Sequence, residues 1–339
     1  MARRSSARWP FVACVVLQTV IFGSGSAITK IAYESITPLW CLVVRFGLAA
    51  LVFAIFLGPR IVRQLRLVRV RDWLPAAVCM ALSFIACNVA LDLTTATNVG
   101  FLVALPVVFA PLLSSIVNRR RYPFSFLPFQ GAVVAGLYLL CANGGAPSFG
   151  WGEVFALLSS MTMAGALVFG EHGLEKLDAA TIAGTQVGAS FAISLLCALA
   201  FEQPMDVASV QPMAWGVVVF LALLSTCLTF FLQNLALTSL PSSTVSLLLT
   251  GEPVFTALFS FVILGETLSA TGLVGAAVIV AGVAAATWME GRRASDADDG
   301  FADGPSPDAH KAAASKAVEM SQVALPLSER CPLASDRAV

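Results

Sequence analysis

The positive charges of this chain lie in short segments between long apolar stretches, and this distribution strongly limits how the chain can fold. Arginines cluster within 60–71 and 119–121. If each apolar stretch crosses a bilayer, these segments fall on the same side as Lys176 and the arginines near both ends. Fourteen Lys/Arg residues then lie on one face and only Lys30 near the other, an asymmetry typical of cytoplasmic loops. The sequence predicts a multi-pass plasma-membrane protein with both termini cytoplasmic.

Composition supports a membrane protein. Hydrophobic residues make up 58% of the chain and charged residues 12%, against roughly 25% charged in soluble domains. The net charge is zero, so we expect no nucleic-acid partner. The arginines near the start and the apolar run after them also fit a secretory signal, but the internal repeat described below favours a retained helix.

Ten apolar stretches are long enough to span a bilayer, which takes about 20 residues as a helix. Breaks are expected where turn residues occur, as at Gly58-Pro59. After residue 290 the chain is rich in Asp, Gly, Ser and Pro, which predicts a disordered cytoplasmic tail. The expected spans are 9–30, 37–57, 73–91, 97–117, 124–142, 150–170, 179–201, 213–234, 242–263 and 270–289.

The second half of the chain repeats the first. Asn88 to Leu91 matches Asn234 to Leu237. Leu105-Pro106-Val107-Val108-Phe109 likewise matches Glu252-Pro253-Val254-Phe255. Each unit holds five spans, so the second enters the membrane reversed, an arrangement that supports alternating access. We expect an all-α protein with ten transmembrane helices in a 5+5 inverted repeat. The expected segments are a cytoplasmic N-terminus (1–8), repeats at 9–146 and 147–290, and the tail (291–339).

These motifs resemble the drug/metabolite transporter superfamily, specifically its EamA-type ten-helix branch. The resemblance rests chiefly on the stretch from Asn234 to Pro253 and on Leu264 to Ser269. It implies a secondary transporter that exports a small organic metabolite, such as an amino acid or a related compound. The arginines at 119–121 and the long tail depart from the family pattern, which weakens any transfer of substrate from a relative.

Two ionisable residues lie deep in the expected spans, where charges are costly and are functional candidates. Arg45 lies about 12 Å from the outer end of the second span, and Glu252 about 15 Å from the inner end of the ninth. Arg45 could bind a substrate carboxylate bidentately, and Glu252 could carry a coupling proton. The alternative is structural: Arg45 as a charge satisfied by helix carbonyls or by an acidic partner, and Glu252 in a packing role beside Pro253.

Neutral polar residues at mid-depth are weaker candidates for substrate binding. Gln18, Ser160 and Gln186 belong to this set, although Ser can also bond back to its own helix. Asn88 and Asn234 lie near the ends of their spans, which predicts helix capping.

Enzymatic motifs are scarce. No phosphate-binding Gly-Lys-Ser/Thr loop is present, and the two histidines, His172 and His310, lie outside the expected spans. We therefore expect no ATP coupling, catalytic residues, metal or cofactor. The partners are a small solute and the lipid bilayer, and we allow for a homodimer. A membrane-embedded enzyme or sensor, or a passive channel, stays open as an alternative.

Overall fold

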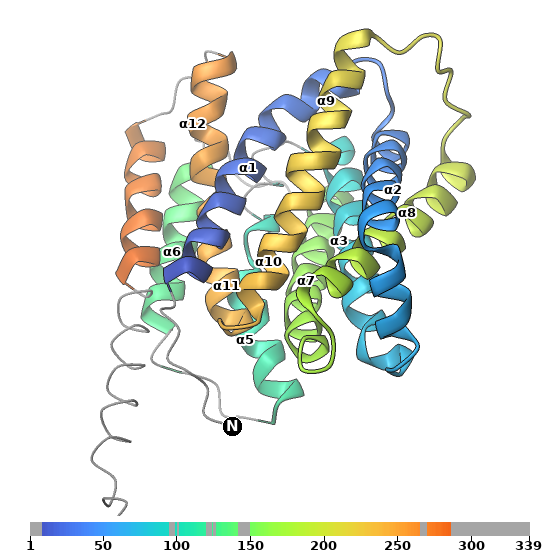
Figure 1. Ribbon diagram of the computed structural model, residues 1–339. Helices are drawn as coiled ribbons and strands as arrows, with labels where there is room; N and C mark the ends of the chain where they lie inside the picture. Colours follow the sequence, from blue (N-terminus) through green and yellow to red (C-terminus); the bar gives the residue numbers. More distant parts are fainter. Residues whose placement is uncertain are drawn as a thin grey trace, which may run out of the picture. The chain divides into compact units, whose positions relative to one another are not determined.

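The computed structural model describes residues 9–94, 99, 102–119, 124, 127–141, 150–264 and 270–285. These residues contain helices and no β-strand, as expected where a backbone inside lipid must satisfy its own polar groups. The expected N-terminal segment and tail lie outside them. In chain order, labelled as in Figure 1, the elements are α1 (Trp9–Tyr33), α2 (Pro38–Leu65), η1 (Val70–Asp72), α3 (Leu74–Leu93), α5 (Pro106–Val117), α6 (Leu127–Cys141), α7 (Trp151–Gly173), α8 (Ala179–Phe201), α9 (Pro212–Ala222), η3 (Leu223–Leu228), α10 (Thr229–Leu237), α11 (Ser242–Leu249), α12 (Glu252–Leu264) and the helix Ala270–Ala285.

Five of these helices are long and apolar enough to cross a membrane: α2, α3, α7, α8 and the continuous segment Pro212–Leu237. Shorter apolar helices fall within the expected spans at 9–30, 97–117, 124–142 and 270–289. Proline in the first turn begins α2, α3, α5 and α9, where its missing N–H costs no helical bond. The chain is therefore an all-α membrane protein.

The expected break at Gly58-Pro59 is wrong. α2 continues through Pro59 to Leu65, so Arg60 and Arg63 lie on the helix instead of in a loop. An internal proline removes one backbone hydrogen bond. This loss is tolerated where neighbouring groups or water take over the freed carbonyl, and the end of a span offers both.

The ninth span is not one continuous helix, as the sequence analysis expected. α11 ends at Leu249 and α12 begins at Glu252, since Pro253 cannot donate to the preceding turn and disfavours helical geometry at the residue before it. The first repeat shows the corresponding feature, because α5 begins at Pro106. Both repeats therefore place a helix start at the matching proline.

Equivalent helices of the two repeats run in opposite directions. The N-terminus of α2 meets the C-terminal end of α8, where the Glu202 carboxylate accepts from Thr37 Oγ1 at 2.5 Å and from the backbone N–H of Leu39 at 3.1 Å. At the other end of the pair, Oδ2 of Asp178, the residue before α8, accepts from Nε of Arg60 on α2 at 2.6 Å. This antiparallel pairing of the second helix of each unit is the inverted repeat that the sequence predicts.

Reciprocal contacts between the last helices of the two repeats show the same two-fold relationship. A Cβ on Gly136 of α6 would lie 2.9 Å from Ile279, and one on Gly282 would lie 2.9 Å from Val133 of α6. Gly136 and Gly282 are matched residues of the two repeats, and so are Val133 and Ile279. Such an exchange of equivalent contacts is what a two-fold axis produces, and glycine at both places permits the close approach.

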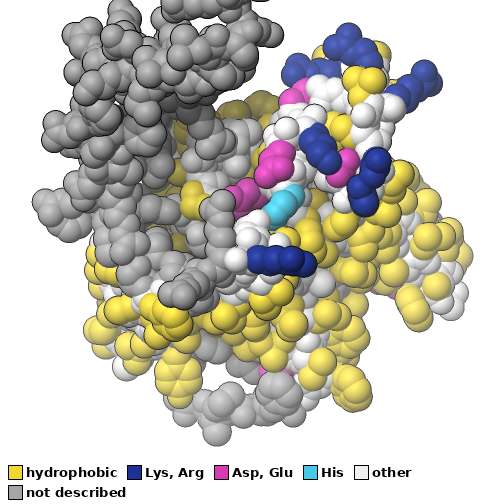
Figure 2. All heavy atoms as spheres, turned by 90° about the horizontal axis from the view of Figure 1, so that it is seen from below, with side chains coloured by type: hydrophobic (Ala, Val, Ile, Leu, Met, Phe, Trp, Pro, Cys, Tyr) yellow, Lys and Arg dark blue, Asp and Glu magenta, His cyan; other side chains and the backbone are white. Residues whose placement is uncertain are grey.

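The links α2–α3 and α7–α8 meet at one end of this bundle, where charged side chains gather (Figure 2). Lys176 Nζ lies 2.8 Å from Asp72 Oδ1, and Arg60 Nη2 lies 2.5 Å from Asp178 Oδ2. This is the end that the charge asymmetry assigns to the cytoplasm. Around the centre, α1 packs against α9, α10 and α12, and α3 packs against α7 and α8 (Figure 1).

Candidate functional site

Arg45 lies in the middle of the bundle, as its depth in the sequence predicts. Its side chain is buried, with 8% of the residue exposed. Nε donates to Thr226 Oγ1 at 2.6 Å, and Nη2 donates to the Ser225 carbonyl at 2.6 Å and to Ser225 Oγ at 3.2 Å. The guanidinium is therefore held by neutral oxygens of one short segment.

That segment is the π-helix η3, which interrupts the long helix between α9 and α10. π-helical turns are rare and occur frequently at functional sites, where they disturb the regular ladder of backbone bonds. In η3 the Ser225 carbonyl accepts a bond from Arg45 of another helix. The equivalent helix of the first repeat, α3, is α-helical from Leu74 to Leu93. The π-turn and the arginine therefore occur together, in contact.

Aromatic rings enclose the other side of the guanidinium. Arg45 Cζ lies 5.3 Å from the ring centroid of Phe84 and 5.7 Å from that of Phe46, within the range of cation–π attraction. Phe230 completes the group, with its centroid 5.6 Å from that of Phe84. This apolar wall keeps the charge away from water on that side.

Glu252 lies at the start of α12, directly after the break in the ninth span. It is partly exposed, and its negative charge attracts the positive charge of Arg45 across the site. Among the described residues, no ion pair within 4.0 Å joins the two. The carboxylate is thus near the guanidinium but separate from it, and helix ends inside a membrane commonly line the binding sites of transporters.

A second polar group lies further along α10, toward the Arg60 end of the bundle. Gln18 Nε2 donates to Gln233 Oε1 at 2.8 Å, and Asn234 Nδ2 donates to Gln186 Oε1 at 2.7 Å. All four residues are buried, with at most 1% exposed. One oxygen or nitrogen of each amide has no hydrogen-bond partner within the described part of the chain. This amide cluster therefore retains two donors and two acceptors that a polar solute or water could use.

The structure brings together four of the five predicted site residues in two groups and leaves the fifth apart. Arg45 and Glu252 share one group, and Gln18 and Gln186 belong to the amide cluster. Ser160 is buried in α7, and no described hydrogen bond connects it to either group.

The expectation of helix capping by Asn88 and Asn234 is wrong. Both lie inside helices, and each donates Nδ2 at 2.8 Å to the carbonyl four residues earlier. Tyr33 Oη donates to the side-chain Oδ1 of Asn88, while Asn234 Nδ2 donates to Gln186 Oε1. The two asparagines therefore connect neighbouring helices. The sequence analysis missed this role and that of Gln233, although the repeated Asn-x-Ala-Leu motif marks the place.

Among the described residues, no group of three His, Cys, Asp or Glu side chains could hold a metal ion. What they contain is a helical bundle with an inverted repeat, a buried arginine and a broken helix. These features define the class as multi-spanning membrane proteins of the inverted-repeat transporter type.

Comparison with known proteins gives the family. The EamA-like transporter family matches residues 9–142 and 150–288, and this chain belongs to it. A relative from Archaeoglobus fulgidus, named an uncharacterized transporter, is 30% identical over 276 residues, which cover 79% of this chain and 83% of the relative. The uncharacterized transporter YwfM of Bacillus subtilis is 25% identical over 280 residues, covering 79% of this chain and 90% of the relative.

A solved crystal structure has the same fold. It matches with a TM-score of 0.71 and 19% identity, covering 83% of this chain and 98% of the other. The solved structure shows the shared fold, and membership of the EamA-like transporter family makes the protein a membrane transporter and not an enzyme.

Proposed function

We propose that the protein is a secondary transporter that exports a small organic metabolite with a carboxylate, such as an amino acid or a related compound, by alternating access. Family membership supports the transporter role, and the observation that carries the substrate class is Arg45. Its contacts in the bundle are neutral oxygens and aromatic rings, so its positive charge has no anion within 4.0 Å among the described residues. A substrate carboxylate would supply that anion.

Arg45 is suited to this role by its geometry. A guanidinium carries five N–H donors in a planar fork that matches a carboxylate. The contacts to η3 use Nε and Nη2, and no described hydrogen bond uses Nη1. Because η3 fixes the plane of the guanidinium in advance, substrate binding would cost less conformational entropy in the Arg45 side chain.

Glu252 is our candidate for the coupling group. A partly exposed carboxylate at a helix break, close to a buried cation, can exchange its proton with water that enters the site. The charge of Glu252, which its protonation sets, would therefore change how strongly the site holds a substrate carboxylate beside Arg45. Proton and substrate occupancy are then linked through one electrostatic interaction.

The amide cluster extends the proposed path. Arg45 binds at Thr226, and the amides lie at Gln233 and Asn234, so about 11 Å of helical rise separates the two groups. The unpartnered amide atoms could hydrogen-bond a solute that moves between them. We include Gln18, Gln186 and Ser160 as polar contacts for the solute along this route.

Flux through proteoliposomes tests the proposal. Purified protein would be reconstituted and given a panel of radiolabelled amino acids, each with and without an imposed proton gradient. We expect saturable uptake of at least one of them, and accelerated exchange when unlabelled substrate is inside. Flux without counterflow indicates a channel, chemically altered solute indicates an enzyme, and no flux across a broad panel contradicts the proposed substrate class.

Plasma-membrane residence with both termini cytoplasmic is part of this proposal. The support is the charge asymmetry of the sequence and the meeting of the α2–α3 and α7–α8 links at one end of the bundle. An exporter in this membrane would load its substrate from the end that carries Arg60 and Lys176.

A further inference from the structure

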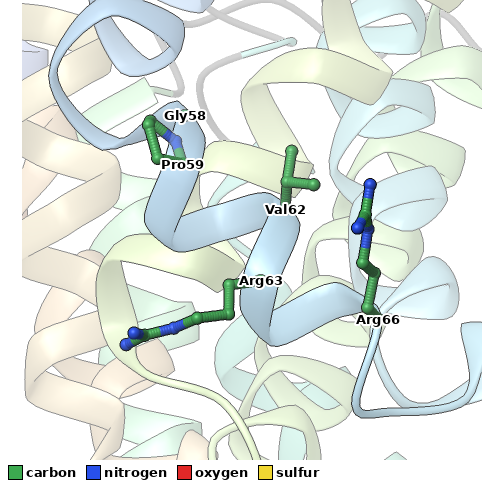
Figure 3. A pocket seen from close by; sticks show the side chains of 5 residues that line it. All are labelled: Gly58, Pro59, Val62, Arg63 and Arg66. Carbon is green, nitrogen blue, oxygen red and sulfur yellow. The ribbon is translucent and has the colours of Figure 1, made fainter.

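The last two turns of α2 form a basic surface that the transport path does not use. A shallow hollow of about 330 Å³ lies along this end of the helix, and Figure 3 shows the side chains that line it. In this view Arg63 and Arg66 extend from α2 in different directions, with Gly58 and Pro59 above them. The lining residues are Gly58, Pro59, Val62, Arg63 and Arg66.

The two arginines of this hollow differ from their neighbour Arg60. Arg60 is paired with Asp178 at 2.5 Å, so its charge is balanced. Arg63 and Arg66 are exposed, and no described side chain forms an ion pair or hydrogen bond with either guanidinium. Two cations with no ion-pair partner among the described residues therefore flank one hollow at the end of a membrane span.

An apolar stripe leads from the hollow toward the membrane interior. Leu51 is 56% exposed, Ile55 65% and Val62 50%, and with Gly58 between them they follow the three- and four-residue spacing of one helix face. Such a face of a transmembrane helix lies against lipid acyl chains. Two cations at the end of an apolar stripe match the shape and charge of an anionic phospholipid.

We propose that this surface is a binding site for an anionic phospholipid. The headgroup phosphate occupies the hollow between Arg63 and Arg66, and one acyl chain follows Leu51 and Ile55. Guanidinium groups bind phosphate oxygens bidentately, and basic sites at this level of transmembrane helices favour anionic headgroups. The absent side chain at Gly58 gives the phosphate room to approach the helix.

Lipid titration of purified full-length protein, followed by native mass spectrometry and thermal unfolding, tests the site. We expect phosphatidylglycerol to bind and raise the unfolding temperature, and phosphatidylcholine with the same chains to do so much less. The double variant Arg63→Gln/Arg66→Gln should bind phosphatidylglycerol about tenfold more weakly. The matched control, Arg69→Gln/Arg71→Gln, removes the same charge from exposed positions outside the hollow and should change binding less than twofold.

A variant that keeps the net charge distinguishes binding in the hollow from nonspecific electrostatic attraction of anionic lipid. A Cβ added at Gly58 meets nothing within 4 Å, so Gly58→Leu should fold normally and fill the hollow. We expect it to weaken phosphatidylglycerol binding about as much as the arginine pair does. Equal losses in the two double variants, equal binding of both lipids, or full binding by Gly58→Leu would each overturn the proposal. The same stabilisation by inorganic phosphate alone would also overturn it, because the ligand would then be a free anion.

Discussion

Arg45 and Gln186 occupy equivalent positions in the two repeats, and both bind the same long helical segment. Each is the eighth residue of its helix, α2 or α8, and each is followed by an apolar residue and a glycine. Arg45 binds Thr226 in the π-helical part of the segment, and Gln186 binds Asn234 in its last turns. The repeat therefore supplies one charged and one neutral anchor, and this difference makes the two halves of the path chemically distinct.

Replacing Arg45 by lysine should weaken substrate binding. An ammonium keeps the charge but cannot donate at once to Thr226, to Ser225 and to a carboxylate in a fixed plane. We expect KM to rise about tenfold or more, with a smaller change in unfolding temperature. The measurement is initial uptake by proteoliposomes at varied substrate concentration.

The matched control for this variant is Arg69→Lys, which makes the same change at an exposed position and should leave KM unchanged. If Arg45→Lys transports with wild-type KM, Arg45 has a structural role, and the substrate must be sought at the amide cluster.

Removing the Thr226 hydroxyl should disturb transport through Arg45. In Thr226→Val the shape is kept, but Nε of Arg45 loses the acceptor at 2.6 Å. Hydrogen bonds to charged groups are worth about 1.5–3 kcal/mol, so we expect KM to rise about tenfold. In the double variant with Arg45→Lys, KM should be little higher than in either single variant, because both changes remove the same contact. Thr229→Val is the control, since the described hydrogen bond of that hydroxyl is long, 3.4 Å to the Thr226 carbonyl of the same helical segment. Equal effects of the two valines would indicate a packing effect.

The burial of the candidate residues was predictable from the sequence because each lies well inside an apolar span. Arg45, Gln18 and Gln186 are all buried in the bundle. Which residues face one another depends on how the repeats pack. No local sequence pattern predicts that Ser225 and Thr226 lie in a π-turn facing α2, or that Gln233 faces α1. Ser160 shows that a polar residue inside an apolar span need not join the site. It has no described hydrogen bond to Arg45, Glu252 or the amide cluster.

The contact between α2 and α8 at Asp178 should depend on pH. Burial raises the pKa of this carboxyl, but hydrogen bonds from Thr181, Gln64 and Arg60 outweigh it and lower the pKa below its ordinary value. A lowered pKa means that the carboxylate stabilises the fold above the unfolded-state pKa of about 4, and that this contribution is lost as the pH falls through the folded-state value.

We therefore expect Asp178→Asn to lower the unfolding temperature at pH 7, by a difference that shrinks below about pH 4. Asparagine can still cap α8, so the change reports on the charge. Thermal unfolding in detergent between pH 3 and 7 is the measurement. Asp92→Asn, at an exposed position on α3, should show no such trend. A difference that stays constant down to pH 3 would contradict this assignment.

The proposed topology predicts which positions an external reagent can reach. In a cysteine-free background, single cysteines at positions 65 and 300 should be protected from an impermeant maleimide in intact cells, and those at 146 and 206 should react. Permeabilised cells supply the control, because all four positions should then react. Labelling of position 65 from outside would reverse the assignment of the Arg60 end to the cytoplasm.

Glu252→Gln should separate coupling from transport. Glutamine keeps the size and polarity of the side chain at the start of α12 but cannot release a proton, and it no longer attracts Arg45. If Glu252 carries the coupling proton, substrate exchange should persist while accumulation driven by a proton gradient is lost. Both quantities come from the same proteoliposomes, with and without the gradient, and Glu175→Gln outside the transmembrane helices serves as the control. Accumulation at the wild-type level would show that Glu252 does not carry the coupling proton. Loss of both accumulation and exchange would instead place Glu252 in substrate binding, because Arg45 would then need the nearby carboxylate to bind substrate.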